Sequence, residues 1–91
     1  MQPTENTILV TGGGSGIGRE LAQRLHAQGN TVIVTGRHLD RLEATIAGYP
    51  HMHARVLDVD DPQAIAVFAR QLIAQFPQLN VLINNAGIMR Y

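Results

Sequence analysis

The eight residues 11–18, TGGGSGIG, contain five glycines and follow directly after the apolar run Ile8-Leu9-Val10. Within and after them, Ile17, Leu21 and Leu25 recur every four residues, which predicts one face of a helix. A glycine-rich turn between a buried strand and a helix lets an anion approach the free backbone N–H groups of the helix start. The stretch therefore predicts a pyrophosphate site, and a glycine turn without a ligand is the alternative.

Short apolar runs alternate with helical periodicity along the whole chain. Strands are predicted at 7–11, 31–36, 54–59 and 80–84, and the third helix opens with Asp61 as N-cap and Pro62 at its first position. This alternation predicts an α/β fold, a partial Rossmann (doubly wound) fold whose parallel sheet has the order 3-2-1-4 and helices on both faces. The stripes expected to be buried are Leu39, Leu42 and Ile46 in the second helix, and Ile65, Phe68, Ala69, Leu72, Ile73 and Phe76 in the third.

Composition excludes several classes of function. The 91 residues carry zero net charge and 45% hydrophobic side chains, which is typical of a globular domain and gives no electrostatic footprint for nucleic acid. No segment has the length and apolarity of a membrane span or a signal peptide. The chain has no cysteine, which is consistent with a reducing compartment, so we expect a cytoplasmic protein without disulfides.

The spacing of the glycines distinguishes between nucleotide-binding motifs. It does not fit G-x-G-x-x-G, and a P-loop is excluded because all seven basic residues are arginines and the motif needs a lysine. It does fit T-G-x-x-x-G-x-G, and it is accompanied by TGR at 35–37, LDV at 57–59 and NNAG at 84–87. With these motifs, essentially the whole chain resembles the classical short-chain dehydrogenase/reductase family.

The resemblance implies a set of cofactor-binding residues. The glycine loop and helix start would surround the pyrophosphate, Asp58 and Val59 would hold the adenine ring, and Asn85 and Ala86 would lie beside the adenosine ribose. It further implies that Asn84 ties the sheet together. The loop residues are Gly12, Gly13, Gly14, Ser15, Gly16, Ile17 and Gly18.

The end of the second predicted strand bears on which cofactor is bound. An NAD site usually has an acidic residue there, about 20 residues past the glycines, which binds the ribose 2′-hydroxyl. Position 36 is glycine, and Arg37 beside it offers a guanidinium group suited to a phosphate. The sequence therefore favours NADP(H), with NAD(H) as the alternative for the cofactor and a solvated surface arginine as the alternative for Arg37.

No catalytic or metal-binding residue is assigned. The family relies on a tyrosine, a lysine four residues later and a serine, whereas this chain has no lysine and its tyrosines are Tyr49, in a predicted turn, and Tyr91, the last residue. His51 and His53 could share a strand face, but no third ligand is in register, so we expect an exposed loop pair without a metal. Residues 1–91 are thus expected to be a truncated NAD(P)-binding Rossmann domain.

Three hypotheses about function follow. The first is the NADP(H)-binding part of an oxidoreductase that acts on a small carbonyl or alcohol substrate; the chain itself is then expected to be inactive. The second is a dinucleotide sensor or regulatory module without chemistry, and the third is an inert truncated product. An uncovered fourth strand would also leave an apolar edge, which predicts self-association.

Overall fold

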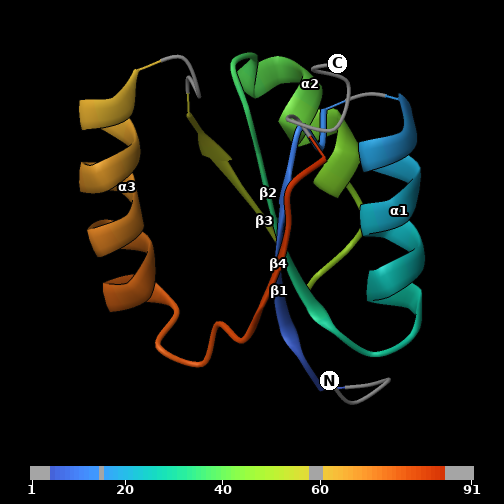
Figure 1. The fold of residues 1–91 in the computed structure, drawn as a ribbon. Coiled ribbons are helices and arrows are strands. Elements are labelled where there is room, and N and C mark those ends of the chain that lie inside the picture. Colours follow the sequence, from blue (N-terminus) through green and yellow to red (C-terminus); the bar gives the residue numbers. More distant parts are fainter. Residues whose placement is uncertain (1–4, 15, 58–60, 86–91) are drawn as a thin grey trace.

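The computed structural model describes residues 5–14, 16–57 and 61–85 of the chain, and it shows an alternating α/β arrangement (Figure 1). The elements are β1 (Thr7–Thr11), α1 (Gly16–Ala27), β2 (Thr31–Gly36), α2 (Leu39–Ile46), β3 (Met52–Val56), α3 (Pro62–Gln75) and β4 (Val81–Ile83). None of the helices in the described ranges is long and apolar enough to cross a membrane.

The four strands form one parallel sheet in the order β3-β2-β1-β4, which confirms the predicted 3-2-1-4 arrangement. Helices α1 and α2 cover one face of the sheet and α3 lies on the other (Figure 1). This is the Rossmann arrangement, in which the chain crosses over between β3 and β4 and ligands bind at the carboxyl ends of the central strands.

Alternate residues of the two central strands supply the core on both faces. Ile8 and Val10 of β1 pack with Leu42 of α2 on one face, whereas Leu9 of β1 packs with Leu72 of α3 on the other. All five side chains of β1 are buried, as expected for a strand covered on both sides. The prediction of β1 from its continuous apolar run is confirmed.

The predicted third strand is wrong in its position. It was expected at 54–59, but β3 begins at Met52 and ends at Val56; positions 58 and 59 of the prediction lie outside the described residues. β3 is an edge strand and is only partly covered. Met52 and Ala54 point into the core, and they alternate with half-buried His53 and Arg55. This alternation carries a weaker apolar signal than the run around Leu57 does.

The helices bury less than their apolar stripes predicted. In α3 only Leu72 is buried, Phe68 is half-buried, and Ile65 and Ile73 are exposed. Phe76, the C-cap residue that follows α3, is also half-buried. Other members of the predicted stripes are also exposed, namely Ala69 in α3, Leu39 in α2 and Ile17 at the start of α1. The α3 face of the sheet offers Leu9 and Ile33 as buried partners, which is enough to cover the middle of one helical stripe. The start of α3 is as predicted, because Asp61 accepts hydrogen bonds from the N–H groups of Gln63 and Ala64.

Candidate functional site

The glycine loop lies between the end of β1 and the start of α1, at the carboxyl edge of the sheet (Figure 1). Gly12 and Gly16 have φ angles of 71° and 59°, a backbone conformation that residues with a Cβ rarely adopt. A Cβ added at Gly16 would have no atom within 4 Å. An incoming anion would therefore meet bare backbone at Gly16, at the positive end of α1.

Two other glycines of the loop are required by the protein's own packing. A Cβ at Gly13 would lie 2.6 Å from the Cβ of Val34, and the Gly13 N–H donates to the carbonyl oxygen of Thr35 at 3.0 Å. A Cβ at Gly18 would collide with the carbonyl oxygen of Gly12. The N–H of Gly13 is thus used within the sheet, and Gly13 shapes the loop without donating to a phosphate.

The end of β4 is joined to the end of β1 beside this loop. The Thr11 hydroxyl donates to the side-chain oxygen of Asn84 at 3.0 Å, which agrees with the expected role of Asn84 in tying the sheet together. The side-chain amide of Asn85 donates to the carbonyl oxygen of Gly12 at 3.3 Å. Asn85 therefore supports the loop directly, and its contact with a ribose stays a prediction.

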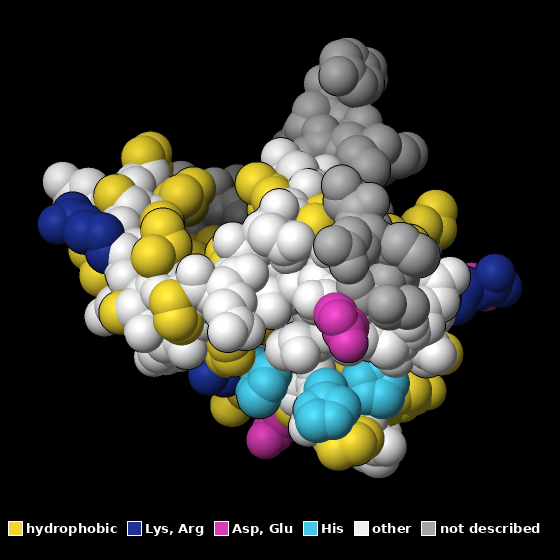
Figure 2. Space-filling view, turned by 90° about the horizontal axis from the view of Figure 1, so that it is seen from below, with side chains coloured by type: hydrophobic (Ala, Val, Ile, Leu, Met, Phe, Trp, Pro, Cys, Tyr) yellow, Lys and Arg dark blue, Asp and Glu magenta, His cyan; other side chains and the backbone are white. Residues whose placement is uncertain are grey.

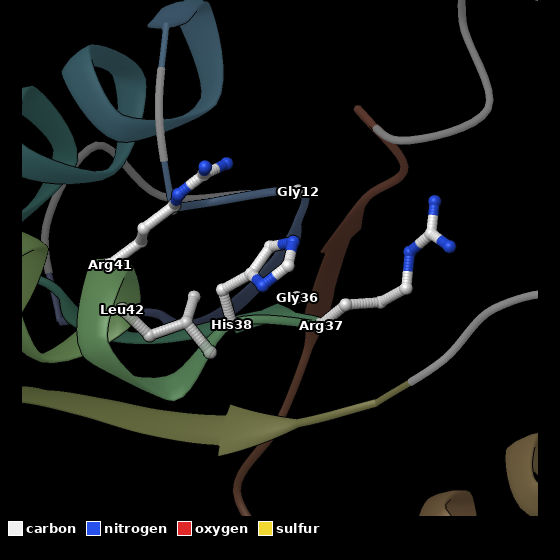
Figure 3. Close-up of a pocket in the computed structure, with 7 residues that line it drawn as sticks. Gly12, Gly36, Arg37, His38, Arg41 and Leu42 are labelled. Atoms are coloured by element: carbon white, nitrogen blue, oxygen red, sulfur yellow. The ribbon is translucent and has the colours of Figure 1, made fainter.

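A cavity of about 250 Å³ opens between the glycine loop, the end of β2 and the first turn of α2 (Figure 3). Among the residues that the structure describes, its lining combines glycine backbone with three nitrogen-bearing side chains and contains no aspartate or glutamate. The lining residues are Gly12, Gly14, Gly36, Arg37, His38, Arg41 and Leu42. This composition suits an anionic ligand, because the side chains can bind its charge and the glycines let the rest of the ligand lie close to the backbone.

The sequence prediction included Arg37 in this site but missed His38 and Arg41. His38 is the residue after Arg37, and Arg41 lies one helical turn further on, so both come to the same edge as Arg37. The spacing Arg37, Arg41 was the signal available in the sequence. Four predicted site residues, Ser15, Asp58, Val59 and Ala86, lie outside the described residues.

Histidines gather at the opposite, amino-terminal edge of the sheet (Figure 2). The His26 ring packs edge-on against Tyr49, with ring centroids 5.1 Å apart, and its centroid is 6.2 Å from that of His51. In the described ranges no three His, Cys, Asp or Glu side chains are grouped as metal ligands. Tyr49, which packs against His26, lies at this edge of the sheet and does not line the cavity at the opposite edge.

The expectation of an exposed loop pair is wrong for His53, which lies in β3 and is half-buried because this strand packs near Phe76. Burial is the main cause that lowers the pKa of His53 below its usual range, and the positive charges of Arg55 and His51 add to it. The His53 ring lies 4.9 Å from the ring of Phe76, and the Arg55 guanidinium is over the same ring at 5.3 Å. These contacts fix the end of α3 on β3 rather than build a site.

Comparison with known proteins agrees with this geometry. A family model described as short chain dehydrogenase matches residues 6–91. The uncharacterized oxidoreductase DltE of Bacillus subtilis (strain 168) is 43% identical over 90 residues, which are 99% of this chain and 36% of DltE. Human retinol dehydrogenase 13 is 37% identical over 90 residues, a match that covers 92% of this chain and 27% of that protein.

Solved structures give the same result. A short-chain dehydrogenase from Streptomyces avermitilis superposes with a TM-score of 0.81 at 38% identity, over 90% of this chain and 30% of that one. The chain thus spans about a third of the length of the relatives it matches. The strand order, the glycine loop joined to Asn84 and Asn85, and the family match over 6–91 lead to one conclusion. The chain belongs to the short chain dehydrogenase family of Rossmann-fold oxidoreductases, which bind a nicotinamide dinucleotide.

Proposed function

We propose that this chain binds NADP(H) and forms the cofactor-binding part of an oxidoreductase that acts on a small carbonyl or alcohol substrate. The observation that carries the proposal is the composition of the cavity at the end of β2. Arg37, His38 and Arg41 line it together with glycine backbone, and none of its described lining residues is a carboxylate. A phosphate dianion on the adenosine ribose would therefore meet cationic and hydrogen-bonding groups among these residues.

Gly36 supports the preference for NADP(H) over NAD(H). It is the last residue of β2 and lines the cavity, at the place where an NAD site carries its acidic residue. Without that carboxylate the ribose 2′-hydroxyl loses a specific acceptor and a 2′-phosphate loses a repulsive neighbour. Both effects favour the phosphorylated cofactor.

The residues of this chain bind and orient, and the nicotinamide supplies hydride donation or acceptance when the cofactor is bound. Gly16 presents backbone to the pyrophosphate, while Asn85 holds the carbonyl of Gly12 in place. The chain has no lysine, and Tyr49 packs against His26 at the other edge of the sheet. These two facts favour binding as the chain's own activity, so a dinucleotide-binding module without chemistry is the second candidate.

Calorimetric titration with NADPH and with NADH tests the proposal. We expect tighter binding of NADPH, and we expect Arg37→Ala to weaken NADPH much more than NADH. Gly36→Asp should reverse the preference, because it adds the carboxylate that binds a ribose 2′-hydroxyl and repels a 2′-phosphate. The added Cβ would lie 3.4 Å from Leu42 Cδ2, so it fits without rearrangement. Arg70→Ala, an exposed arginine on α3, is the matched control for loss of a positive charge. Equal affinity for the two nucleotides would overturn the preference, and no binding of either would overturn the function.

A further inference from the structure

Thr45 of α2 is fully buried, although its side chain carries a hydroxyl group. The hydroxyl oxygen lies 2.9 Å from the carbonyl oxygen of Gly13 in the glycine loop and 3.1 Å from that of Arg41, one turn earlier in the same helix. A hydroxyl has one proton to donate, and the shorter of the two contacts is the one to the loop. Bonding to the carbonyl four residues earlier is a common feature of threonine in helices, whereas the contact with Gly13 is particular to this fold.

Neighbouring elements hold both backbone polar groups of Gly13. Its N–H donates to the carbonyl oxygen of Thr35 in β2 at 3.0 Å, and its carbonyl oxygen accepts from the Thr45 hydroxyl. No other residue in the described ranges donates to this carbonyl oxygen. Leaving a buried carbonyl unpaired is costly, so the Thr45 hydroxyl fixes the direction in which the carbonyl of Gly13 points.

The direction of this carbonyl decides where the next N–H points. The peptide bond between Gly13 and Gly14 is trans, and in a trans peptide the C=O and N–H groups point in opposite directions. Because the Gly13 carbonyl is turned toward buried Thr45, the Gly14 N–H points away from it, and Gly14 lines the cavity. Within the part of the chain that the structure describes, this N–H donates to no acceptor. It is therefore available to a ligand.

We propose that Thr45 is a positioning residue of the nucleotide site, which holds the peptide between Gly13 and Gly14 so that the Gly14 N–H donates to an oxygen of the bound dinucleotide. The inference rests on the proposed function in one respect, that a dinucleotide occupies the cavity. It is independent of the preference for NADP(H), because both cofactors carry ribose and phosphate oxygens. Thr45 does not line the cavity, so it acts on the ligand only through this peptide.

A second hydrogen bond at Thr45 supplies a matched control. The side-chain amide of half-buried Gln23 in α1 donates to the backbone carbonyl of Thr45 at 3.1 Å, and α1 and α2 lie on the same face of the sheet (Figure 1). The backbone of Thr45 thus joins the two helices, whereas its hydroxyl joins α2 to the loop. Removing the Gln23 amide weakens helix packing at the same residue and leaves the hydroxyl in place.

Amide hydrogen exchange of the unsubstituted chain, measured by NMR, tests the orientation of the peptide directly. We expect the Gly14 amide to exchange rapidly in the free chain and to slow about tenfold or more with saturating NADPH or NADH, as one new hydrogen bond requires. The Gly13 amide, which donates to Thr35, is the internal control and should be protected in both states. A Gly14 amide that is protected without nucleotide, or that does not slow with it, would overturn the inference.

Calorimetric titration of three variants with NADPH and NADH tests the role of the hydroxyl. Thr45→Val removes the hydroxyl at nearly the same volume, Thr45→Ser keeps it, and Gln23→Leu removes the bond between the helices. We expect Thr45→Val to weaken both nucleotides by the same factor, about tenfold, as loss of one hydrogen bond to a charged acceptor does. Thr45→Ser and Gln23→Leu should stay within about twofold of the unsubstituted chain. Circular dichroism at the titration temperature verifies that each variant is folded.

The outcomes separate this inference from the proposed function. If the unsubstituted chain binds neither nucleotide, both fail; if it binds the two equally, only the NADP(H) preference fails. Unchanged affinity in Thr45→Val, or an equal loss in Gln23→Leu, would overturn the inference alone, because helix packing would then account for the role of Thr45. A loss in Thr45→Ser as large as that in Thr45→Val would also overturn it. If Thr45→Val does not fold, the exchange of the Gly14 amide in the unsubstituted chain decides.

Discussion

The side-chain oxygen of Asn30 accepts two hydrogen bonds from Asn6, one from its backbone N–H at 3.0 Å and one from its side-chain amide at 3.1 Å. Asn30 in turn donates to the carbonyl oxygen of Leu25 at 2.8 Å, and Asn80 donates to the side chain of Asn6 at 3.0 Å. The three asparagines precede β2, β1 and β4, respectively. They join the amino-terminal ends of these strands, opposite the edge that carries the glycine loop.

Replacing Asn30 by alanine should lower the free energy of unfolding by about 2 to 3 kcal/mol, since Asn30 is 2% exposed and its partners would lose their acceptor and donor. Asn80→Ala should cost less, because Asn80 is exposed. Urea denaturation followed by circular dichroism measures both. Nucleotide affinity of the folded variants should not change, and a loss of affinity in Asn30→Ala would contradict the separation of the two edges.

Gly13→Ala should destabilise the fold by about 3 kcal/mol or more, since overpacking a rigid site forces backbone shifts. The added Cβ would lie 2.6 Å from the Cβ of Val34, so Val34→Ala should not rescue it. Gly48→Ala is the control: Gly48 has a φ of 82° but open space around it, and its cost should be about 1 kcal/mol of backbone strain. Thermal melts of the three variants test this, and a rescue by Val34→Ala would show that the loop moves instead.

Stability should fall as the pH drops below about 6.5, the ordinary pKa of histidine. Burial, Arg55 and His51 lower the pKa of His53 in the folded chain, so the unfolded chain binds a proton first. The contribution is fully present above the unfolded pKa and is lost as the pH falls toward the folded one. NMR titration of the His53 ring, with and without urea, gives the two pKa values. His53→Gln should reduce the dependence of the unfolding free energy on pH, and an unchanged slope would contradict the prediction.

We also expect the chain to self-associate through the uncovered side of β4. Leu82 of β4 is 63% exposed, and Ile73 of α3, on the same face of the sheet, is 59% exposed (Figure 2 shows the apolar side chains over α3). β4 is also an edge strand among the described strands. Sedimentation velocity at increasing concentration should show association that Leu82→Glu reduces. Ile17→Glu, at an exposed position on α1, is the control and should not reduce it. An unsubstituted chain that stays monomeric at every concentration would rule out self-association through β4.

The sequence predicted the features that depend on local patterns. The buried run of β1, the cap at Asp61 and the order of the strands all follow from neighbouring residues or from the rules of chain crossover. The start of β3 was missed because an edge strand needs only half of its side chains covered. The burial of α3 was overestimated because a helical stripe shows which face is apolar, not how much sheet lies beneath it.

Contacts between distant residues could not be predicted from such patterns. Asn6 and Asn80 are 74 residues apart, and no periodicity connects them. Thr45 looks like an ordinary helix residue in the sequence, yet its buried hydroxyl reaches the carbonyl of Gly13. Arg41 was missed although its spacing from Arg37 is visible in the sequence, because its nearness to the cavity depends on how α2 packs on the loop.

The packing of Gly18 has a consequence for how the glycine motif should be used in genome searches. A side chain at this motif position would collide with the carbonyl oxygen of Gly12, so it would harm folding even in a chain that never meets a nucleotide. Proteins that have lost the ligand would still keep this glycine as long as they keep the fold. A match at this position is therefore a marker of the fold, and under the proposed function the residues at positions 36, 37, 38 and 41 would be the better marker of which ligand is bound.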